Sequence, residues 1–481
     1  MFNSYTKIIN IARSFAFLLL SYTLPSLVFG FGGGEWNSEI AMEAQFFAEE
    51  SDTSDTRSNF SVLLTTEYFE EWNDGADSLV FVPRVRLDQH DADRNSFDIR
   101  ELVWVHVEDT WEIRTGVQEI AWGVSFMGSL VDVVNQTSMA DDMFGSKLGQ
   151  PMVNLSLVQD WGILDLYVLA GFRQATLPGP DSRPGLPFDI ATDEAEIPLS
   201  QKEINGLDYA MRWQHSWDSF EWALSYFYGT SRDADMDFNY DVARPGLVST
   251  YSQVQQLGVE LIYIWNGYTF RFESKTVDGA SERDKALGMY TAALIGFEYR
   301  WDSVFGSDYG IMWDVSYNHD DRKSSLAAIT EKDVTALAVL NFNDEFDSRI
   351  ALGTIWDVKD DEGIVFSNAG RRLSEYWKID LMAVYFLTEQ KATPPEVTQA
   401  QTEAELANLL ASFELFGNSD LEKMVDSFGR LISEYGAFSP EVTNAIDNLQ
   451  TIVDGISLRS DNKLGMLEDE SFVRVVLTHY F

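Results

Sequence analysis

Cysteine is absent from the 481-residue sequence, so neither a disulfide nor a thiol nucleophile is available to it. Basic residues are scarce: 34 Lys and Arg stand against 77 Asp and Glu, which gives a formal net charge of −43. Nucleic acid is therefore excluded as a partner, because phosphate backbones attract basic surfaces. After residue 30 the sequence also has no apolar run as long as the ~20 residues that a membrane-spanning helix needs.

Motifs for catalysis and for metal binding are missing as well. The five histidines are far apart and form no His-x-x-x-His pair, and there is no Gly-x-Ser-x-Gly motif. Ser125 and His106 leave a lipid hydrolase open as a distant third alternative. The acidic clusters at residues 233–237 and 360–362 lack the full calcium-loop pattern and fit solvated loops better. We therefore expect no enzyme activity, no metal and no cofactor.

What the sequence does contain is a long series of alternating segments rich in aromatic residues, with 14 Trp, 19 Tyr and 32 Phe. A period of two residues is typical of half-buried strands. About eighteen segments show it, most of them near the ~10 residues that a tilted membrane strand requires. They cover residues 38–48, 59–72, 79–89, 97–108, 111–124, 153–159, 163–174, 207–216, 220–229, 255–265, 268–277, 289–301, 309–318, 334–341, 346–357, 363–373, 377–387 and 472–481. The sequence predicts an all-β transmembrane antiparallel barrel of eighteen strands, with sixteen as the alternative, because closure leaves no sheet edge unpaired.

The connections between these segments alternate in length. Short connections lie near residues 108–111, 160–162, 216–219, 265–267 and 374–377, and long ones lie near 125–150, 176–205 and 230–250. Short periplasmic turns and long external loops are expected of outer-membrane barrels, and an even strand number places both termini on the periplasmic side. A soluble all-β protein, which is the alternative, has no need for so regular an alternation.

Most segments have one apolar face and one polar face. In residues 220–229, Leu224 belongs to the aromatic, apolar face and Ser225 to the other. Trp213 and Trp265 stand near strand ends, where aromatic girdles anchor barrels at headgroup depth. We expect the polar face to line the lumen, and the predicted lining residues are Arg100, Arg114, Gln118, Arg173, Arg212, Glu260, Arg271, Glu273, Glu298, Arg300, Arg349 and Arg474.

The last segment carries Val473, Val475, Leu477, His479 and Phe481 on one face. An alternating strand that ends in phenylalanine resembles the C-terminal signal read by the insertion machinery of Gram-negative outer membranes. His479 departs from it, since that position more often holds Tyr. An ordinary C-terminal edge strand is the alternative for this segment taken alone.

The first thirty residues have the three regions of a secretory signal peptide. Lys7 and Arg13 precede the apolar residues 15–29, and small residues follow at Gly30 and Gly32. A retained membrane anchor is the alternative, but the apolar stretch is too short for a spanning helix. We expect residues 1–30 to be removed on export.

Several stretches resemble a large family of uncharacterised proteobacterial outer-membrane β-barrels, which is distantly similar to alginate-export-type porins. They are Arg-Thr-Gly-Val-Gln-Glu-Ile-Ala-Trp-Gly at 114–123, Asp-Val-Val-Asn at 132–135, the loop at 177–184 and the hairpin at 371–380. The resemblance covers most of residues 36–388 and the last strand. It implies an outer-membrane location and a channel-like barrel. It implies no ligand residues, because the family has no generally established cargo.

Residues 389–468 depart from the strand pattern. Capping boxes at 402–405 and 419–422 and the sequence Ser439-Pro-Glu441 predict the starts of three helices, each with one apolar stripe. We expect strands one to seventeen in residues 31–388, a mainly helical insertion in 389–468 and the last strand in 469–481. The insertion is predicted to form an external loop or a lumen plug.

Together these features predict a porin-like outer-membrane channel that passes an unidentified solute through a charged lumen, passively or driven by a partner. The runner-up is a closed structural or adhesive surface barrel. The expected partners are the outer-membrane lipid and the barrel-assembly machinery of a Gram-negative bacterium, with an inner-membrane exporter or a periplasmic carrier as a further partner.

Overall fold

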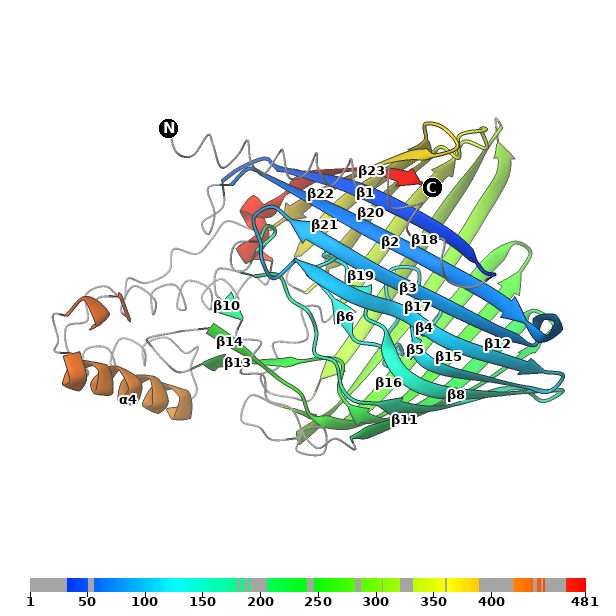
Figure 1. The fold of residues 1–481 in the computed structure, drawn as a ribbon. Coiled ribbons are helices and arrows are strands. Elements are labelled where there is room, and N and C mark those ends of the chain that lie inside the picture. Colours follow the sequence, from blue (N-terminus) through cyan, green and yellow to red (C-terminus); the bar gives the residue numbers. More distant parts are fainter. Residues whose placement is uncertain are drawn as a thin grey trace.

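The computed structural model describes residues 33–50, 56–179, 182–185, 189–190, 206–239, 246–281, 287–304, 306–320, 332–359, 361–388, 418–435, 439–442, 444–445 and 464–481. Eighteen strands form one antiparallel sheet that closes on itself as a barrel (Figure 1). They are β1 (Glu35–Phe47), β2 (Ser58–Trp72), β3 (Asp77–Asp88), β4 (Ser96–Glu108), β5 (Trp111–Gln118), β8 (Gln150–Gln159), β9 (Gly162–Ala170), β11 (Leu207–Trp217), β12 (Phe220–Thr230), β15 (Gln253–Trp265), β16 (Tyr268–Ser281), β17 (Leu287–Val304), β18 (Ser307–Asp320), β19 (Asp333–Asn341), β20 (Arg349–Asp357), β21 (Glu362–Arg372), β22 (Trp377–Leu387) and β23 (Phe472–Tyr480). The predicted eighteen-stranded barrel is confirmed. The predicted signal peptide lies outside the described residues.

Closure joins the first strand to the last. β1 pairs with β2 on one side and with β23 on the other. The Phe481 N–H donates to the Ser38 carbonyl oxygen at 2.9 Å, and the Ser38 N–H donates to the Phe481 carbonyl oxygen at 3.0 Å. The His479 ring stacks between Trp377 and Phe481, with ring centroids 4.5 and 5.8 Å away. Backbone pairing and ring packing together fasten this end of the β1–β23 seam.

The other end of the seam is fastened by Arg183, which comes from the connection between β9 and β11. Its Nε lies 3.0 Å from Glu470 Oε2, and its Nη2 donates to the Asp469 carbonyl at 2.9 Å. Its Nη1 donates to the carbonyls of Glu49 at 3.0 Å and Thr56 at 2.6 Å. One buried guanidinium therefore holds the segment ahead of β23 against the connection between β1 and β2.

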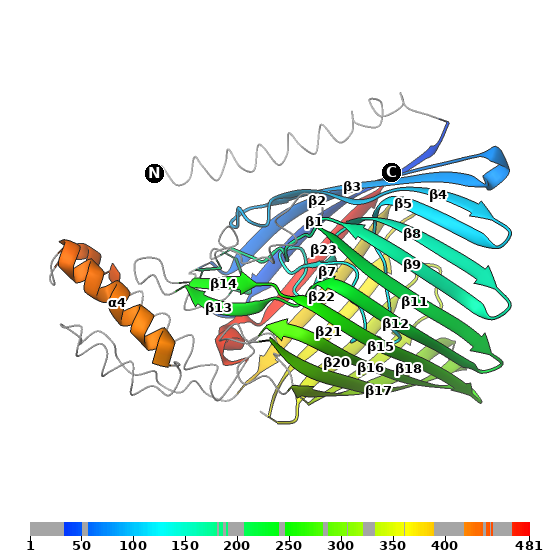
Figure 2. The same cartoon turned by 90° about the horizontal axis from the view of Figure 1, so that it is seen from below.

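The two ends of the barrel differ. At the end that holds Glu35 and Tyr480, termed the turn end, β4–β5, β8–β9, β11–β12 and β15–β16 are each joined by two residues. The opposite end, termed the loop end, carries the long connections. Beyond it lie β10 (Asp189–Ile190), β13 (Asp235–Asn239), β14 (Gly246–Thr250) and α4 (Asn418–Tyr435), as Figures 1 and 2 show. The predicted alternation of short and long connections matches this arrangement.

The helical insertion is described in part. α4 confirms the second predicted helix. Residues 440–442 are helical, and the Ser439 Oγ accepts a hydrogen bond from the Val442 N–H at 3.3 Å, as its predicted capping position requires. The first predicted helix lies outside the described residues. Among the helices that the structure describes, none is both long and apolar enough to cross a membrane.

Side chains alternate between the two faces of the wall. On β12, Leu224 is 44% exposed on the outer face, whereas Ser225 points inward and is 4% exposed. On β17, Ile295 is exposed on the outer face, and its neighbour Gly296 lies against inward side chains. Exposed aromatic rings gather at the turn end, among them Trp217, Trp265 and Trp301. The outer surface is therefore apolar with an aromatic rim, as lipid contact requires.

One predicted strand is wrong at its end. The sequence pattern predicts a single strand over residues 111–124, but β5 stops at Gln118. The N–H groups of Gly123 and Val124 donate to the carboxylates of Glu260 on β15 and Glu273 on β16 instead of to a neighbouring strand. The chain therefore leaves the wall and enters the barrel.

Arginine substitutions on the two faces of β20 should lower the free energy of unfolding by different amounts. Leu352→Arg places a charge on the exposed outer face and is expected to destabilise the protein in lipid vesicles by about 2–4 kcal/mol. Ala351→Arg, one position away, points inward toward the side of the wall that holds Arg349 and Asp380, and should cost far less. Unfolding by denaturant in vesicles measures both. Equal costs would contradict the face assignment.

Candidate functional site

The chain between β5 and β8, residues 119–149, folds into the barrel and is termed the inner loop. It contains two short strands, β6 (Thr137–Ser138) and β7 (Ser146–Lys147). Its Val131 and Val134 are fully buried, and Trp122 is nearly so. These side chains form one apolar cluster with inward side chains of the wall from β8 to β16, namely Met152, Tyr167, Leu169, Ala210, Phe227, Val254, Val277 and Ala280. The inner loop is therefore packed against this wall as a hydrophobic core.

Another part of the inner loop reaches the opposite wall. Met127 and Met143 pack against a second apolar cluster, formed by Phe47, Phe366, Met382, Val384, Phe386 and Phe472. The ring centroids of Phe144 and Phe366 are 5.8 Å apart. The inner loop therefore crosses the interior from one wall to the other.

Three inward carboxylates, termed the acid cluster, accept hydrogen bonds from the first half of the inner loop: Glu260 on β15, Glu273 on β16 and Asp314 on β18. Glu273 receives the N–H groups of Val124, of Ser125 at 2.7 Å and of Leu130 at 2.7 Å, together with the Ser129 hydroxyl at 2.9 Å. The Ser125 hydroxyl donates to Asp314 at 2.7 Å, and the Gly123 N–H donates to Glu260 at 3.1 Å. The three carboxylates thus accept hydrogen bonds from backbone N–H groups in the first half of the inner loop, which does not pair with a neighbouring strand.

Two arginines offset the charge of the acid cluster. Arg212 on β11 contacts both oxygens of Glu260 at 2.8 and 2.9 Å. Arg271 on β16 lies 3.4 Å from Asp314 and 3.0 Å from Glu298. Gly296 makes room for the second pair, because a Cβ there would lie 2.0 Å from Asp314 Oδ1. In the acid cluster, Glu260 and Asp314 are therefore ion-paired, whereas Glu273 is held by its four hydrogen bonds from the inner loop.

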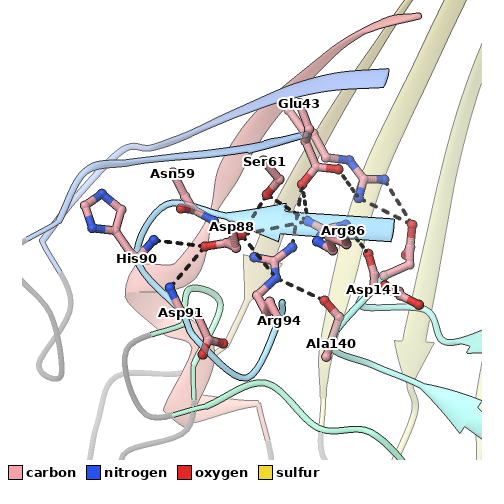
Figure 3. A network of polar contacts seen from close by, with 12 residues as sticks. Glu43, Asn59, Ser61, Arg86, Asp88, His90, Asp91, Arg94, Ala140 and Asp141 are labelled. Atoms are coloured by element: carbon pink, nitrogen blue, oxygen red, sulfur yellow. Dashed lines mark hydrogen bonds and ion pairs between the residues drawn. The ribbon is translucent and has the colours of Figure 1, made fainter. Parts of the chain in front are cut away.

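The second half of the inner loop meets five arginines on the other side, termed the arginine cluster: Arg84, Arg86, Arg94, Arg100 and Arg474. Figure 3 shows Arg86 and Arg94 between the wall acids Glu43 and Asp88 and the inner-loop residues Ala140 and Asp141. The fully buried Arg86 lies 2.8 Å from Glu43 and donates to the Asp141 carbonyl at 3.1 Å. Arg94 donates to the Ala140 carbonyl at 3.0 Å.

Inner-loop carboxylates complete the arginine cluster. Asp141 pairs with Arg100 and lies 3.8 Å from Arg84, and Asp142 lies 3.3 Å from Arg474. The acid cluster therefore binds N–H and hydroxyl groups of the inner loop, whereas the arginine cluster binds carbonyls and carboxylates of the inner loop. Breaking one partner of such a buried ionic contact typically costs about 3–5 kcal/mol, because the remaining charge is left uncompensated.

Beneath the inner loop, toward the turn end, lies a recess of about 610 Å³. Its lining includes Gly123 and Val124 of the inner loop and Arg212, Gln214, Glu221 and Glu260 of the wall. The wall groups named here are polar or charged, and apolar residues such as Val124, Ile163 and Leu261 lie beside them. The recess can therefore hold water and small polar solutes.

The structure distributes the predicted lining residues over several places. Six of them belong to the two clusters or contact them directly: Arg100, Arg212, Glu260, Arg271, Glu273 and Arg474. Glu298 pairs with Arg271, which itself contacts the acid cluster. Gln118 is the buried last residue of β5. Arg114 and Arg300 are about half exposed, and Arg349 lies near Gly370 on the inner side of β20. Arg173 stands apart, at the loop end, where it pairs with Asp98 at 2.8 Å.

Sequence reasoning missed Arg84, Arg86 and Arg94, as well as Asp141 and Asp314. Arg84 and Arg86 alternate on a strand whose bounds the sequence predicted well, so the same period of two would have found them. Asp141 carried no such signal, because it lies in the inner loop and meets Arg84, Arg86 and Arg100 only in the folded barrel.

Ser125 and His106 do not meet. The Ser125 hydroxyl donates to Asp314 inside the barrel, whereas His106 Nδ1 lies 2.9 Å from Asp77 and its ring stacks on the exposed Trp104. This pair therefore cannot serve a lipid hydrolase. Within the described ranges, no group of three or more His, Asp or Glu side chains is placed to hold a metal ion.

Comparison with known proteins yields only distant structural likeness. No family model and no curated protein sequence matches the chain. Among solved structures, the chain is similar to OmpT of Vibrio cholerae, with a TM-score of 0.40 and 8% identity over 93% of this chain and 97% of that one. It is also similar to Pseudomonas aeruginosa OpdL, with a TM-score of 0.41 and 10% identity over 74% of this chain and 94% of that one. For Salmonella typhi OmpF in complex with daunomycin, the TM-score is 0.40 and the identity 9%, over 93% of this chain and 97% of that one. At such scores the likeness carries no argument about function. The resemblance to the alginate-export-like family stays a prediction.

Proposed function

We propose that the protein is an outer-membrane channel, narrowed by its inner loop, which passes a small polar solute without a chemical step. Its closed barrel with an apolar outer surface and an aromatic rim supports a membrane location. The turn end then faces the periplasm and the loop end faces outward.

The observation that carries this proposal is the attachment of the inner loop to both walls by charged groups. A barrel of eighteen strands encloses far more space than its own side chains fill, so a segment held across it decides what passes. Met139, Asp142 and Phe144 of the inner loop are about 40% exposed, and Arg114 and Arg300 are exposed on the turn-end side. Water therefore reaches the inner loop from the barrel interior.

Recording single-channel currents from the purified protein in a planar bilayer tests the proposal. Discrete conductance steps support the channel. The second candidate, a closed structural barrel, is favoured by the apolar contacts of Met127 and Met143 with the far wall. A fully assembled barrel that carries no current would establish that second candidate.

Ion preference should depend on the exposed arginines. The double variant Arg114→Ser, Arg300→Ser removes two positive charges from the turn-end part of the lumen and is expected to shift the reversal potential toward cations. Arg212 and Arg271 are unsuitable for this test, because each neutralises a carboxylate of the acid cluster. Arg57→Ser, at an exposed position in the connection between β1 and β2, serves as the control. A reversal potential equal to that of the parent would place Arg114 and Arg300 outside the ion path.

The attachment of the inner loop to the arginine cluster through Asp141 should withstand mild acid. Burial acts to raise the pKa of Asp141, but the charges of Arg84, Arg100 and Arg86 outweigh it and hold the pKa below its ordinary value. A lowered carboxyl pKa stabilises the folded state above the unfolded pKa, and the effect is lost as the pH falls through the lowered value. Conductance recorded at pH 7 and pH 5 should therefore be the same for the parent. A large change that Asp141→Asn abolishes would contradict this.

A further inference from the structure

The barrel wall has an irregular place where β5 turns inward. The ladder between β4 and β5 ends at the pair Leu102–Val117, while β4 continues toward the loop end as far as Ser96. Gly149, just ahead of β8, fills the place that β5 vacates. It lies so close to β4 that a Cβ on it would be 2.3 Å from the Arg100 carbonyl oxygen.

A groove of about 270 Å³ opens at this place, and it is mostly apolar. Phe97, Ile99, Val117 and Pro151 line it, together with Gly149, Asp98 and Arg173. Phe97 is 70% exposed, and Val117 faces Pro151 across the ladder between β5 and β8. The groove therefore lies on the outer surface of the barrel, among side chains that would contact lipid.

Arg173 stands at one margin of this groove. Its Nη1 donates to the Gly149 carbonyl at 2.8 Å, and its Nη2 lies 2.8 Å from Asp98 Oδ1. Asp98 is shared, because its other oxygen lies 3.3 Å from Arg100 Nε. One carboxylate therefore faces two guanidinium groups, and the side chain of Arg173 remains one-third exposed. An apolar groove with a cation at its margin matches an acyl chain joined to an anionic group.

The depth of the groove fits that chemistry. Phe97 stands eleven residues before Glu108, the last residue of β4 at the turn end. At about 3.3 Å per residue and a tilt of about 40°, Phe97 lies about 28 Å from that end along the barrel axis. The apolar band of such barrels is about 25 Å tall, so Arg173 lies at headgroup depth on the loop-end side.

We propose that this groove binds one acyl chain of a phosphate-bearing lipid, with the phosphate on Arg173. Arginine binds phosphate oxygens through charge-assisted hydrogen bonds, and these gain strength at the edge of an apolar medium. The inference rests on the membrane location proposed above but not on conduction. If the assembled barrel carries no current, the proposed channel function is wrong, but the proposed lipid site is unaffected.

Native mass spectrometry of the purified full chain tests the site. The probes are phosphatidylglycerol, lipid A, diacylglycerol with the same chains but no phosphate, and inorganic phosphate. Arg173→Gln removes the charge, and Val117→Trp fills the groove while keeping the arginine at position 173. The matched control is Arg57→Gln, which neutralises another arginine near the loop end that also pairs with an acid, Glu50. Heat-modifiable electrophoretic mobility confirms that each variant has formed the barrel.

We expect the parent and Arg57→Gln to retain one phosphate-bearing lipid, and both groove variants to retain about tenfold less. The lipid retained, lipid A or phosphatidylglycerol, identifies the source of the phosphate. Retention by Arg173→Gln and Val117→Trp equal to the parent would overturn the proposal. Equal retention of diacylglycerol would show the phosphate contact to be wrong. If inorganic phosphate binds and none of the lipids does, the proposed binding of an acyl chain in the groove is wrong.

Discussion

Replacing residues 124–146 with a short Gly-Ser linker is expected to raise the single-channel conductance about threefold or more, because an eighteen-stranded barrel without a plug encloses a wide aqueous channel. The replacement removes Met127 and Met143, which touch the far wall, and Asp141, which the arginine cluster holds. Planar-bilayer recording at fixed salt measures the effect.

The replacement also has a structural cost that must be controlled. It exposes inward apolar side chains such as Leu169 and Phe227, which the inner loop covers. Glu273→Gln is the milder companion. It keeps the side-chain volume but replaces one of the two accepting oxygens by an NH2 group, which sets donor against donor at two of the four hydrogen bonds. Its currents should fluctuate between the parental level and higher levels. If the linker variant assembles and conducts like the parent, the inner loop does not narrow the path.

Deleting Phe481 should lower the yield of assembled protein in the outer membrane by about tenfold or more, since the deletion removes two backbone hydrogen bonds to Ser38 and one ring of a stack. The β1–β23 seam is the pairing that closes the barrel, so a weakened seam leaves strand edges open. Cell fractionation with heat-modifiable electrophoresis measures the yield.

A substitution separates the two contributions of Phe481. Phe481→Ala keeps both backbone hydrogen bonds to Ser38 but removes the ring beside His479. If the ring serves as a signal to the insertion machinery, Phe481→Ala should behave like the deletion. If the backbone bonds matter more, it should behave like the parent. Normal outer-membrane yield of the deletion variant would contradict both explanations.

The strands and their faces were predictable because alternation is a local pattern. The adjacent residues Leu224 and Ser225 could be assigned to opposite faces from the strand sequence alone. Phe220, Trp222 and Tyr228 repeat the two-residue period on the same strand. Wherever the wall is regular, the sequence predicted the strand to within a few residues.

The inner loop was not predictable in this way. Residues 119–124 continue the composition of a strand, and nothing local marks Gln118 as its last residue. The groups that draw the chain inward are distant in sequence: Glu273 lies 149 positions from Val124, and Asp314 lies 189 positions from Ser125. A single sequence does not reveal such pairings, so the arginine cluster's partner in the inner loop escaped notice.

The position of Arg183 imposes an order on assembly. Its guanidinium holds Glu470 and the Asp469 carbonyl on one side of the seam and the carbonyls of Glu49 and Thr56 on the other, yet it is carried by the connection between β9 and β11. The loop-end contacts of the β1–β23 seam therefore form only when the connection between β9 and β11 is in place. Closure at the loop end of the β1–β23 seam therefore depends on a segment that lies about midway along the chain.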